Sequence, residues 1–263
     1  MTTQSHLERG SDESATVGAD AAGAPAHTGS VTTRVLGIIA LVSSALVVYL
    51  ALVGTPADVV QNDAVRLLYI HVPVVITAYI ACATAAGASA VWLWKRTQWW
   101  DLVAASAAEI AALFIAGTLI TGSIWGGAAW GTYWTWDARL TATALLFLLT
   151  LGYLAVRRIP ASSEVRGRRS AIVALLLVPN MIITKYSVEW WRSLHQGATI
   201  LDPTRKPEIA GTQFFTLTFA MAVGAVVFAW MIIHRFRIAY LQDQADEIGL
   251  GYAIAERRAE GRS

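Results

Sequence analysis

Apolar residues in this chain occur in six long, nearly continuous runs. The runs cover about residues 33–53, 71–94, 102–124, 140–156, 170–188 and 212–234. Each is close to the roughly 20 residues that a helix needs to cross a bilayer. We therefore predict an all-α integral membrane protein with six transmembrane helices.

Polar segments flank these runs at both ends of the chain. Residues 1–30 are rich in Ser, Gly, Ala, Asp and Glu, and such a segment cannot bury enough apolar surface to fold alone. The pattern predicts a disordered cytoplasmic tail over 1–30, a membrane domain over 31–237 and a cytoplasmic C-terminal tail over 238–263.

Composition agrees with a membrane protein and excludes several other classes. Hydrophobic residues make up 56% of the chain and charged residues 14%, and the mean hydropathy is +0.51, which is outside the range of ordinary soluble domains. The net charge of +2 is too small to indicate a nucleic-acid partner. The single cysteine, Cys82, excludes an internal disulfide, a CxxC redox pair and a covalent CxxCH haem site.

The distribution of Lys and Arg predicts an orientation. If the six spans alternate, Lys95 and Arg96, the arginines of 157–169 and Arg235 with Arg237 all lie on one side. By the positive-inside rule that side is cytoplasmic, so both termini are inside. The loops at about 54–70, 125–139 and 189–211 then face outward. The third of these loops also carries basic residues, so the rule holds in sum rather than loop by loop.

The second outward loop is unusually aromatic. The segment WGGAAWGTYWTWDARLT, residues 125–141, contains Trp125, Trp130, Tyr133, Trp134 and Trp136. An interfacial belt also places such rings at a membrane surface, but a belt needs only scattered rings. The glycines at 126, 127 and 131 allow sharp folding. We predict a platform for a planar ligand, with the belt as the alternative.

Two histidines are predicted on the same side as this loop. His71 opens the second span and His195 lies in the third outward loop. Either one alone would be interpreted as an interfacial histidine. Together they can supply the two axial ligands of a six-coordinate haem iron. Zinc fits less well, because it needs a third or fourth ligand at close spacing.

Several charged residues near these loops have candidate roles. Arg66 and Arg139 are placed to bind haem propionates, and snorkelling toward water is the alternative for each. Asp137, part of the predicted haem-binding loop, is expected to pair with Arg139 or to bond the loop backbone. Glu109 lies within the third span, where a charge is costly, and is therefore expected to face the bundle interior or a protein partner.

Four segments carry a resemblance to known proteins. WGTYWTWDARLT resembles the tryptophan-rich "WWD" signature of haem-handling proteins of cytochrome c maturation. VRLLYIHVP, LITGSIWG and YSVEWWRSLHQG, in that order, resemble the haem exporter protein C (CcmC) family. The resemblance covers about residues 57–200. Arg192 departs from the pattern, since a neutral polar residue is more usual there.

This resemblance implies a function and a set of partners. His71 and His195 would be the axial ligands, and the segment from Trp125 to Arg139 would form an outward-facing haem platform. Haem b would be a transient cargo, presented at the periplasmic face of the bacterial plasma membrane to the haem chaperone CcmE. The transporter subunits CcmA and CcmB and the small membrane protein CcmD would be further partners. The chain has no GxxxxGK[ST] phosphate loop, so a partner would hydrolyse any ATP.

Haem delivery without catalysis is therefore the leading functional prediction. One alternative is a haem-dependent membrane enzyme, either a cytochrome c synthetase or a haem oxidoreductase. No predicted span carries a histidine at mid-depth, which argues against electron transfer across the membrane. Another alternative is an assembly scaffold without haem, because Trp and Tyr also dominate protein interfaces.

Overall fold

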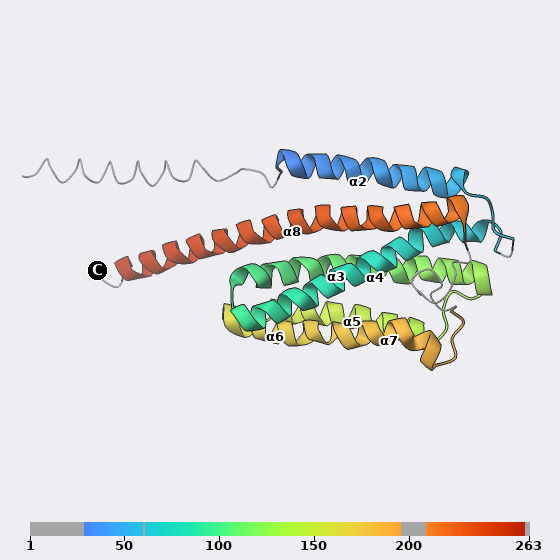
Figure 1. Ribbon diagram of the computed structural model, residues 1–263. Coiled ribbons are helices and arrows are strands. Elements are labelled where there is room, and N and C mark those ends of the chain that lie inside the picture. Colours follow the sequence, from blue (N-terminus) through green and yellow to red (C-terminus); the bar gives the residue numbers. More distant parts are fainter. Residues whose placement is uncertain (1–28, 60, 196–208, 261–263) are drawn as a thin grey trace, which may run out of the picture. The chain divides into compact units, whose positions relative to one another are not determined.

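Long helices that lie side by side make up nearly all of the described part of the chain (Figure 1). The computed structural model describes residues 29–59, 61–195 and 209–260, and one compact unit, Val31–Ser263, holds the helices. They are α2 (Val31–Tyr49), the π-helix η2 (Leu50–Gly54), the 3-10 helix η3 (Asp63–Leu67), α3 (Leu68–Lys95), α4 (Gln98–Trp130), α5 (Ala138–Arg158), α6 (Ser163–Leu175), α7 (Leu177–Trp190) and α8 (Gly211–Glu260).

Within the described residues, six helical segments are long and apolar enough to cross a membrane, which confirms the predicted fold class. Three of them differ in detail from the apolar runs. The fifth consists of α6 and α7, which meet at Leu176. The third, α4, continues six residues past the predicted end, to Trp130. The sixth, α8, continues to Glu260, so position 237, where the sequence marked the end of the membrane domain, lies inside one helix.

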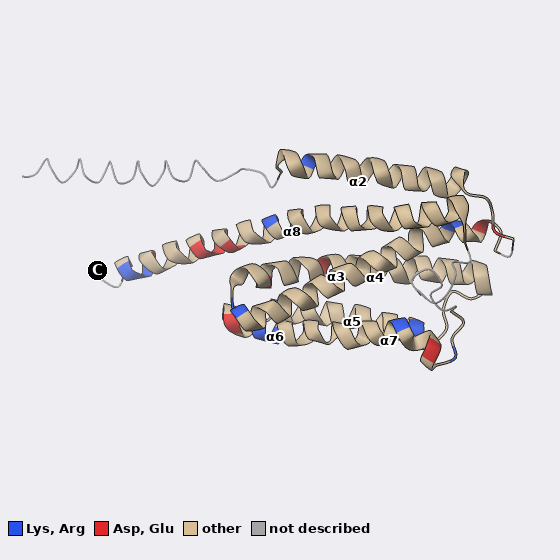
Figure 2. Cartoon of the chain, viewed as in Figure 1, with Lys and Arg blue, Asp and Glu red and all other residues tan. Residues whose placement is uncertain are grey.

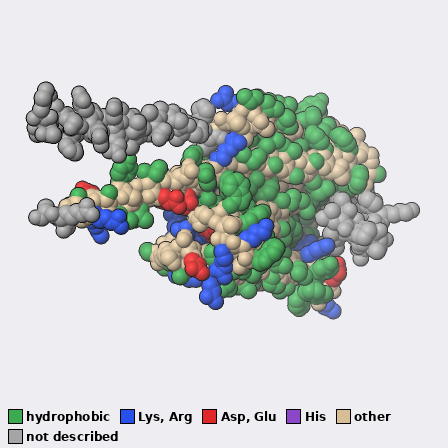
Figure 3. Space-filling view, turned by 60° about the vertical axis from the view of Figure 1, so that its left-hand side comes forward, with side chains coloured by type: hydrophobic (Ala, Val, Ile, Leu, Met, Phe, Trp, Pro, Cys, Tyr) green, Lys and Arg blue, Asp and Glu red, His purple; other side chains and the backbone are tan. Residues whose placement is uncertain are grey.

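Charged residues lie mainly at the two ends of the bundle and on the C-terminal part of α8 (Figure 2). The end that carries residues 125–137 is named the tryptophan end. The opposite end is named the arginine end, because the α3–α4 and α5–α6 connections there carry the basic residues of 95–96 and 157–169. Between the two ends, the surface of the bundle is covered mainly by hydrophobic side chains (Figure 3).

The core is built on close packing between α3 and α4. Fully buried alanines line both helices, among them Ala81 and Ala85 of α3 and Ala107 and Ala111 of α4. Small side chains let two helix backbones approach each other closely, which is a common basis for association within membranes. Helices α5, α6 and α7 pack together, and α2 packs on α8.

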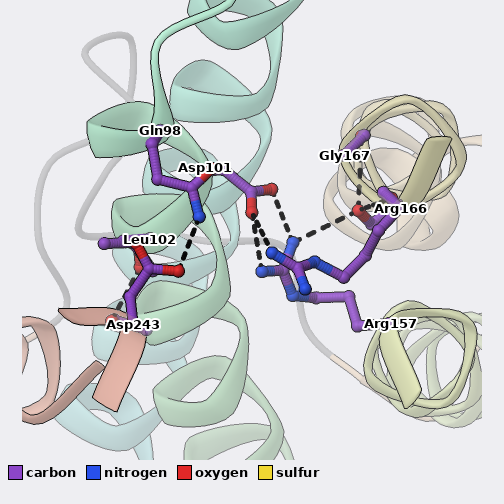
Figure 4. A network of polar contacts seen from close by, with 9 residues as sticks. Gln98, Asp101, Leu102, Arg157, Arg166, Gly167 and Asp243 are labelled. Carbon is purple, nitrogen blue, oxygen red and sulfur yellow. Dashed lines mark hydrogen bonds and ion pairs between the residues drawn. The ribbon is translucent and has the colours of Figure 1, made fainter. Parts of the chain in front are cut away.

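A buried ion pair holds α4, α5 and α6 together at the arginine end (Figure 4). Asp101 of α4 accepts hydrogen bonds from Nη1 and Nη2 of Arg157 on α5, at 2.6 and 2.8 Å. Nη1 of Arg157 also donates to Ser170 of α6 at 3.3 Å. One turn earlier, Gln98 donates to Asp243 of α8 at 3.0 Å. Nη2 of Arg166 on α6 lies 4.0 Å from the same carboxylate. The side chain of Asp101 is only 4% exposed, so loss of Arg157 would leave this buried charge with Arg166 alone as a more distant partner.

Candidate functional site

His71 lies in the first turn of α3, and its side chain contacts α4. Its Nδ1 is 2.9 Å from the hydroxyl of Thr121. That hydroxyl donates its own proton to the carbonyl of Gly117 at 2.7 Å. Because a hydroxyl has a single proton to donate, Nδ1 of His71 is the donor in the first contact. The lone pair of the neutral imidazole is therefore on Nε2.

A glycine on α4 makes room for this imidazole. A Cβ atom at Gly122 would lie 2.9 Å from Cε1 of His71, closer than carbon atoms normally approach. The ring of Trp125 contacts His71 edge-on, with 5.6 Å between ring centroids. The indole N–H of Trp125 donates to the side-chain oxygen of Gln61 at 3.0 Å. His71 is thus held between one face of α4 and an anchored tryptophan.

The tryptophan-rich segment is only partly a loop. Residues 125–130 form the last turns of α4, and the chain leaves the helix at Gly131, whose φ of 73° suits glycine. The prediction that Gly126 and Gly127 fold the backbone sharply is therefore wrong. They are helical, and they allow the loop to fold back onto α4: a Cβ at Gly127 would lie 2.6 Å from the ring of Tyr133.

Asp137 connects this loop to the segment that carries Ser193 and His195. Its Oδ1 caps α5 by accepting the backbone N–H of Leu140 at 2.8 Å, one of the two arrangements expected from the sequence. Its Oδ2 accepts the hydroxyl of Ser193 at 2.9 Å and lies 3.0 Å from Nδ1 of His195. The backbone N–H of His195 donates to the Ser193 oxygen at 3.1 Å. The sequence did not predict this contact between Asp137 and His195.

The protonation of this pair follows from its surroundings. Burial lowers the pKa of the His195 imidazole below its usual value, and the hydrogen bond and charge of Asp137 offset this effect only in part. Burial acts to raise the pKa of the Asp137 carboxyl, but the hydrogen bonds from Leu140, Ser193 and His195 outweigh it, so that pKa is lowered. A carboxylate can only accept a hydrogen bond. Nδ1 of His195 therefore carries the proton, and Nε2 carries the lone pair.

The two imidazoles consequently offer the same nitrogen, Nε2, to a ligand. Each donates from Nδ1 to a fixed oxygen, and each retains a lone pair on Nε2. The rings are near enough to each other, and to Arg139, to interact electrostatically. Trp130 contacts His195 edge-on at 4.8 Å, as Trp125 contacts His71. Among the described residues, no group of three or more His, Cys, Asp or Glu side chains could hold a metal ion.

The two candidate propionate-binding arginines differ in their contacts. Nη1 of Arg66 donates to the carbonyls of Ala51 and Leu52 at 2.7 and 2.5 Å, and Nε donates to Asp63 at 3.0 Å. Arg66 thereby connects η3 to η2. Nη2 of Arg139 donates to the carbonyl of Lys185 on α7 at 3.2 Å.

The remaining aromatic residues of the segment lie at the surface. Tyr133 is 70% exposed and Trp136 is 81% exposed. Trp134 packs edge-on against Trp136, with 5.4 Å between the ring centroids. A cavity of about 590 Å³ opens beside Trp136 and Asp137, between α5 and α7, but neither histidine lines it. The structure therefore places His71 against Trp125, and His195 against Trp130 and Asp137, at the tryptophan end, and leaves the rings of Tyr133 and Trp136 exposed.

Thr121, Ser193 and Gln61 hold site residues and were not singled out from the sequence. Thr121 is four residues before Trp125, so both project from one face of α4, and this spacing was a usable signal. Ser193 is two residues before His195. Gln61 gives no local signal, because its partner, Trp125, is 64 residues away.

Comparison with known proteins gives consistent matches. The family model described as CcmC, heme exporter protein C, matches residues 20–249. The chain is 34% identical over 193 residues to a heme exporter protein C from Haemophilus influenzae, covering 72% of this chain and 77% of that protein. It is 40% identical over 155 residues to the heme exporter protein C of Escherichia coli K12, covering 58% of this chain and 62% of that protein. A putative ccmC-like mitochondrial protein for cytochrome c biosynthesis from Marchantia polymorpha is 36% identical over 157 residues, 60% of this chain and 66% of that protein.

Proposed function

Since the chain belongs to the heme exporter protein C (CcmC) family, we propose that it binds haem at its tryptophan end and passes it on during the maturation of c-type cytochromes. The observation that carries this proposal is the matched state of His71 and His195. Each neutral imidazole is anchored through Nδ1 and offers Nε2, which is the arrangement that an axial ligand requires.

The residues of the tryptophan end suit the other parts of a haem as well. Trp130, Trp134 and Trp136 offer ring faces and edges to a planar macrocycle. Arg139, and the Nη2 group of Arg66, are candidates to bind the propionates. When bound, haem would supply an iron with two axial positions. The protein's own residues would hold and orient it, which favours delivery over catalysis.

The proposed function also includes an orientation of the chain in the membrane and a set of protein partners. The basic residues of the α3–α4 and α5–α6 connections support a cytoplasmic location for the arginine end, and the tryptophan end would then lie at the outer face of a bacterial plasma membrane. Haem b bound there would be accessible to the haem chaperone CcmE. CcmA, CcmB and CcmD are the further partners that we propose, with both termini of this chain on the cytoplasmic side.

Purification of the full chain with and without CcmE tests this function. We expect a low-spin haem spectrum from the protein alone and covalently retained haem on the chaperone after co-expression. His71→Ala and His195→Ala should each change the low-spin spectrum and reduce transfer, because removing one imidazole leaves an open or water-bound position. His234→Ala, on α8 beside Arg235 and away from the tryptophan end, is the matched control. If both site variants kept the wild-type spectrum, the axial assignment would be wrong.

A further inference from the structure

A second ion pair lies within the apolar spans, far from the tryptophan end. Glu109 lies on α4, eleven residues after Gln98, which is about 16 Å along the helix axis. It pairs with Arg235 of α8 through two contacts, from Nη2 to Oε1 at 2.6 Å and from Nε to Oε2. Both residues belong to segments that are long and apolar enough to cross a membrane.

This pair is open to the outside of the bundle. The side chains of Glu109 and Arg235 are 37% and 30% exposed, whereas Asp101 in the other ion pair is 4% exposed. Both line a groove of about 350 Å³ between α4 and α8. The other walls of the groove are formed by the apolar side chains of Ile110, Leu113, Trp230, Met231 and Ile238 and by His234. The imidazole of His234 packs edge-on against Trp230, with 5.2 Å between the ring centroids.

The chemistry of the groove restricts what can cover it. Exposed charged groups are costly at this depth, and acyl chains offer neither donors nor acceptors to them. The pair has no net charge, so a third charged group would itself remain uncompensated. A neutral polar side chain among apolar neighbours is the complementary surface, because it can hydrogen-bond to the pair without adding a charge.

We propose that this groove receives a transmembrane helix of another protein, and that this helix presents a Ser, Thr, Asn or Gln side chain to the Glu109–Arg235 pair. The proposal is independent of haem binding, since the pair lies at a different depth from the contacts that His71 and His195 make with α4. It also accounts for the retention of two charges in apolar spans. A binding partner, rather than the interior of the bundle, is what completes the coverage of Glu109.

Site-specific photo-crosslinking in native membranes tests the proposal. A photoreactive amino acid is placed at Leu113, which is 59% exposed at the groove, and separately at Leu148 of α5, which is 63% exposed. We expect the Leu113 position alone to yield a protein adduct, and peptide mapping should place it in an apolar span of another protein, beside a Ser, Thr, Asn or Gln. Adducts only with lipid, adducts with a second copy of this chain, or equal adducts at Leu148 would overturn the proposal.

Removal of the ion pair provides a second measurement. The double variant Glu109→Leu/Arg235→Leu removes both charges together and leaves no unpaired charge. If the pair recognises a polar side chain, the adduct at Leu113 should fall about ten-fold, as expected for loss of a polar contact between membrane helices. An undiminished adduct would overturn the proposal. If the double variant does not accumulate, the mapped adduct of the otherwise unaltered protein decides, and a captured span with only apolar residues at the contact refutes it.

Discussion

Nδ1 of His195 lies 3.0 Å from Oδ2 of Asp137, and the other oxygen of the same carboxylate caps α5 through the N–H of Leu140. One side chain therefore both starts a helix and orients an imidazole. The orientation of His195 is thus fixed by the first turn of α5, although the two residues are far apart in sequence. Ser193 completes the arrangement by bonding to both.

Asp137→Asn should separate these two functions of the carboxylate. Asparagine is as good an N-cap as aspartate, so α5 and the thermal stability of the protein should change little. The neutral amide is a weaker partner for Nδ1–H of His195, and loss of such a partner typically costs 10–100-fold in metal affinity. We expect haem affinity, measured by spectroscopic titration, to fall by about ten-fold or more. Asp137→Ala should in addition lower stability by about 1 kcal/mol. Equal haem affinity in all three proteins would contradict the orienting role.

The stability of the haem-free protein should decrease on acidification. The folded pKa of His195 is below its value in the unfolded chain, so the unfolded state binds more protons as pH falls below the ordinary imidazole pKa of about 6.5. Asp137 acts in the same direction at lower pH, because its folded pKa is also lowered. We expect the Tm to fall between pH 7 and pH 5, and to fall less in His195→Gln. Identical pH profiles would rule out this contribution.

Gly122→Ala should disturb His71 without removing it. The added Cβ would lie 2.9 Å from the imidazole, so the ring has to move away from Thr121. Overpacking of this kind costs roughly 1–3 kcal/mol, and we expect a weakened low-spin haem spectrum together with a lower Tm. Gly152→Ala on α5 is the matched control, because nothing lies within 4 Å of its Cβ position. The same haem spectrum in both variants would show that the close contact at Gly122 is unimportant.

Arg66→Gln and Arg139→Gln should have different principal effects. Arg66 binds the carbonyls of Ala51 and Leu52, and hydrogen bonds from a charged donor are worth roughly 1.5–3 kcal/mol each. We expect Arg66→Gln mainly to lower thermal stability, and Arg139→Gln mainly to lower haem retention during gel filtration. Normal retention in both variants, at wild-type protein levels, would mean that the propionates are bound elsewhere.

The sequence predicted the six spans because each is an apolar run of membrane length, a signal that needs no knowledge of tertiary contacts. It did not predict where α4 and α8 end. Helix ends depend on capping and on the residues that follow. Helix α4 ends after Trp130 because Gly131 adopts the left-handed conformation that caps it. Helix α8 continues past Arg237 because the residues that follow are mostly good helix formers.

Site residues were predictable to a similar extent. Aromatic density and the side of the membrane identified the tryptophan end and the two histidines. Their hydrogen-bond partners were not predictable, because Thr121 is 50 residues from His71 and Asp137 is 58 residues from His195. Contacts at such separations depend on how the helices pack. Glu109 was expected to face the interior or a partner. It is half-buried at the groove between α4 and α8 and pairs there with Arg235 of the same bundle, so contact with a partner remains a prediction.

Both histidines contact the last turns of α4. His71 rests against Thr121, Gly122 and Trp125, while His195 rests against Trp130 at the end of the same helix. The separation of the two imidazoles therefore depends on this short stretch of α4 and on the start of α5, where Asp137 holds His195. Unwinding of a single turn at the end of α4 would change that separation at once.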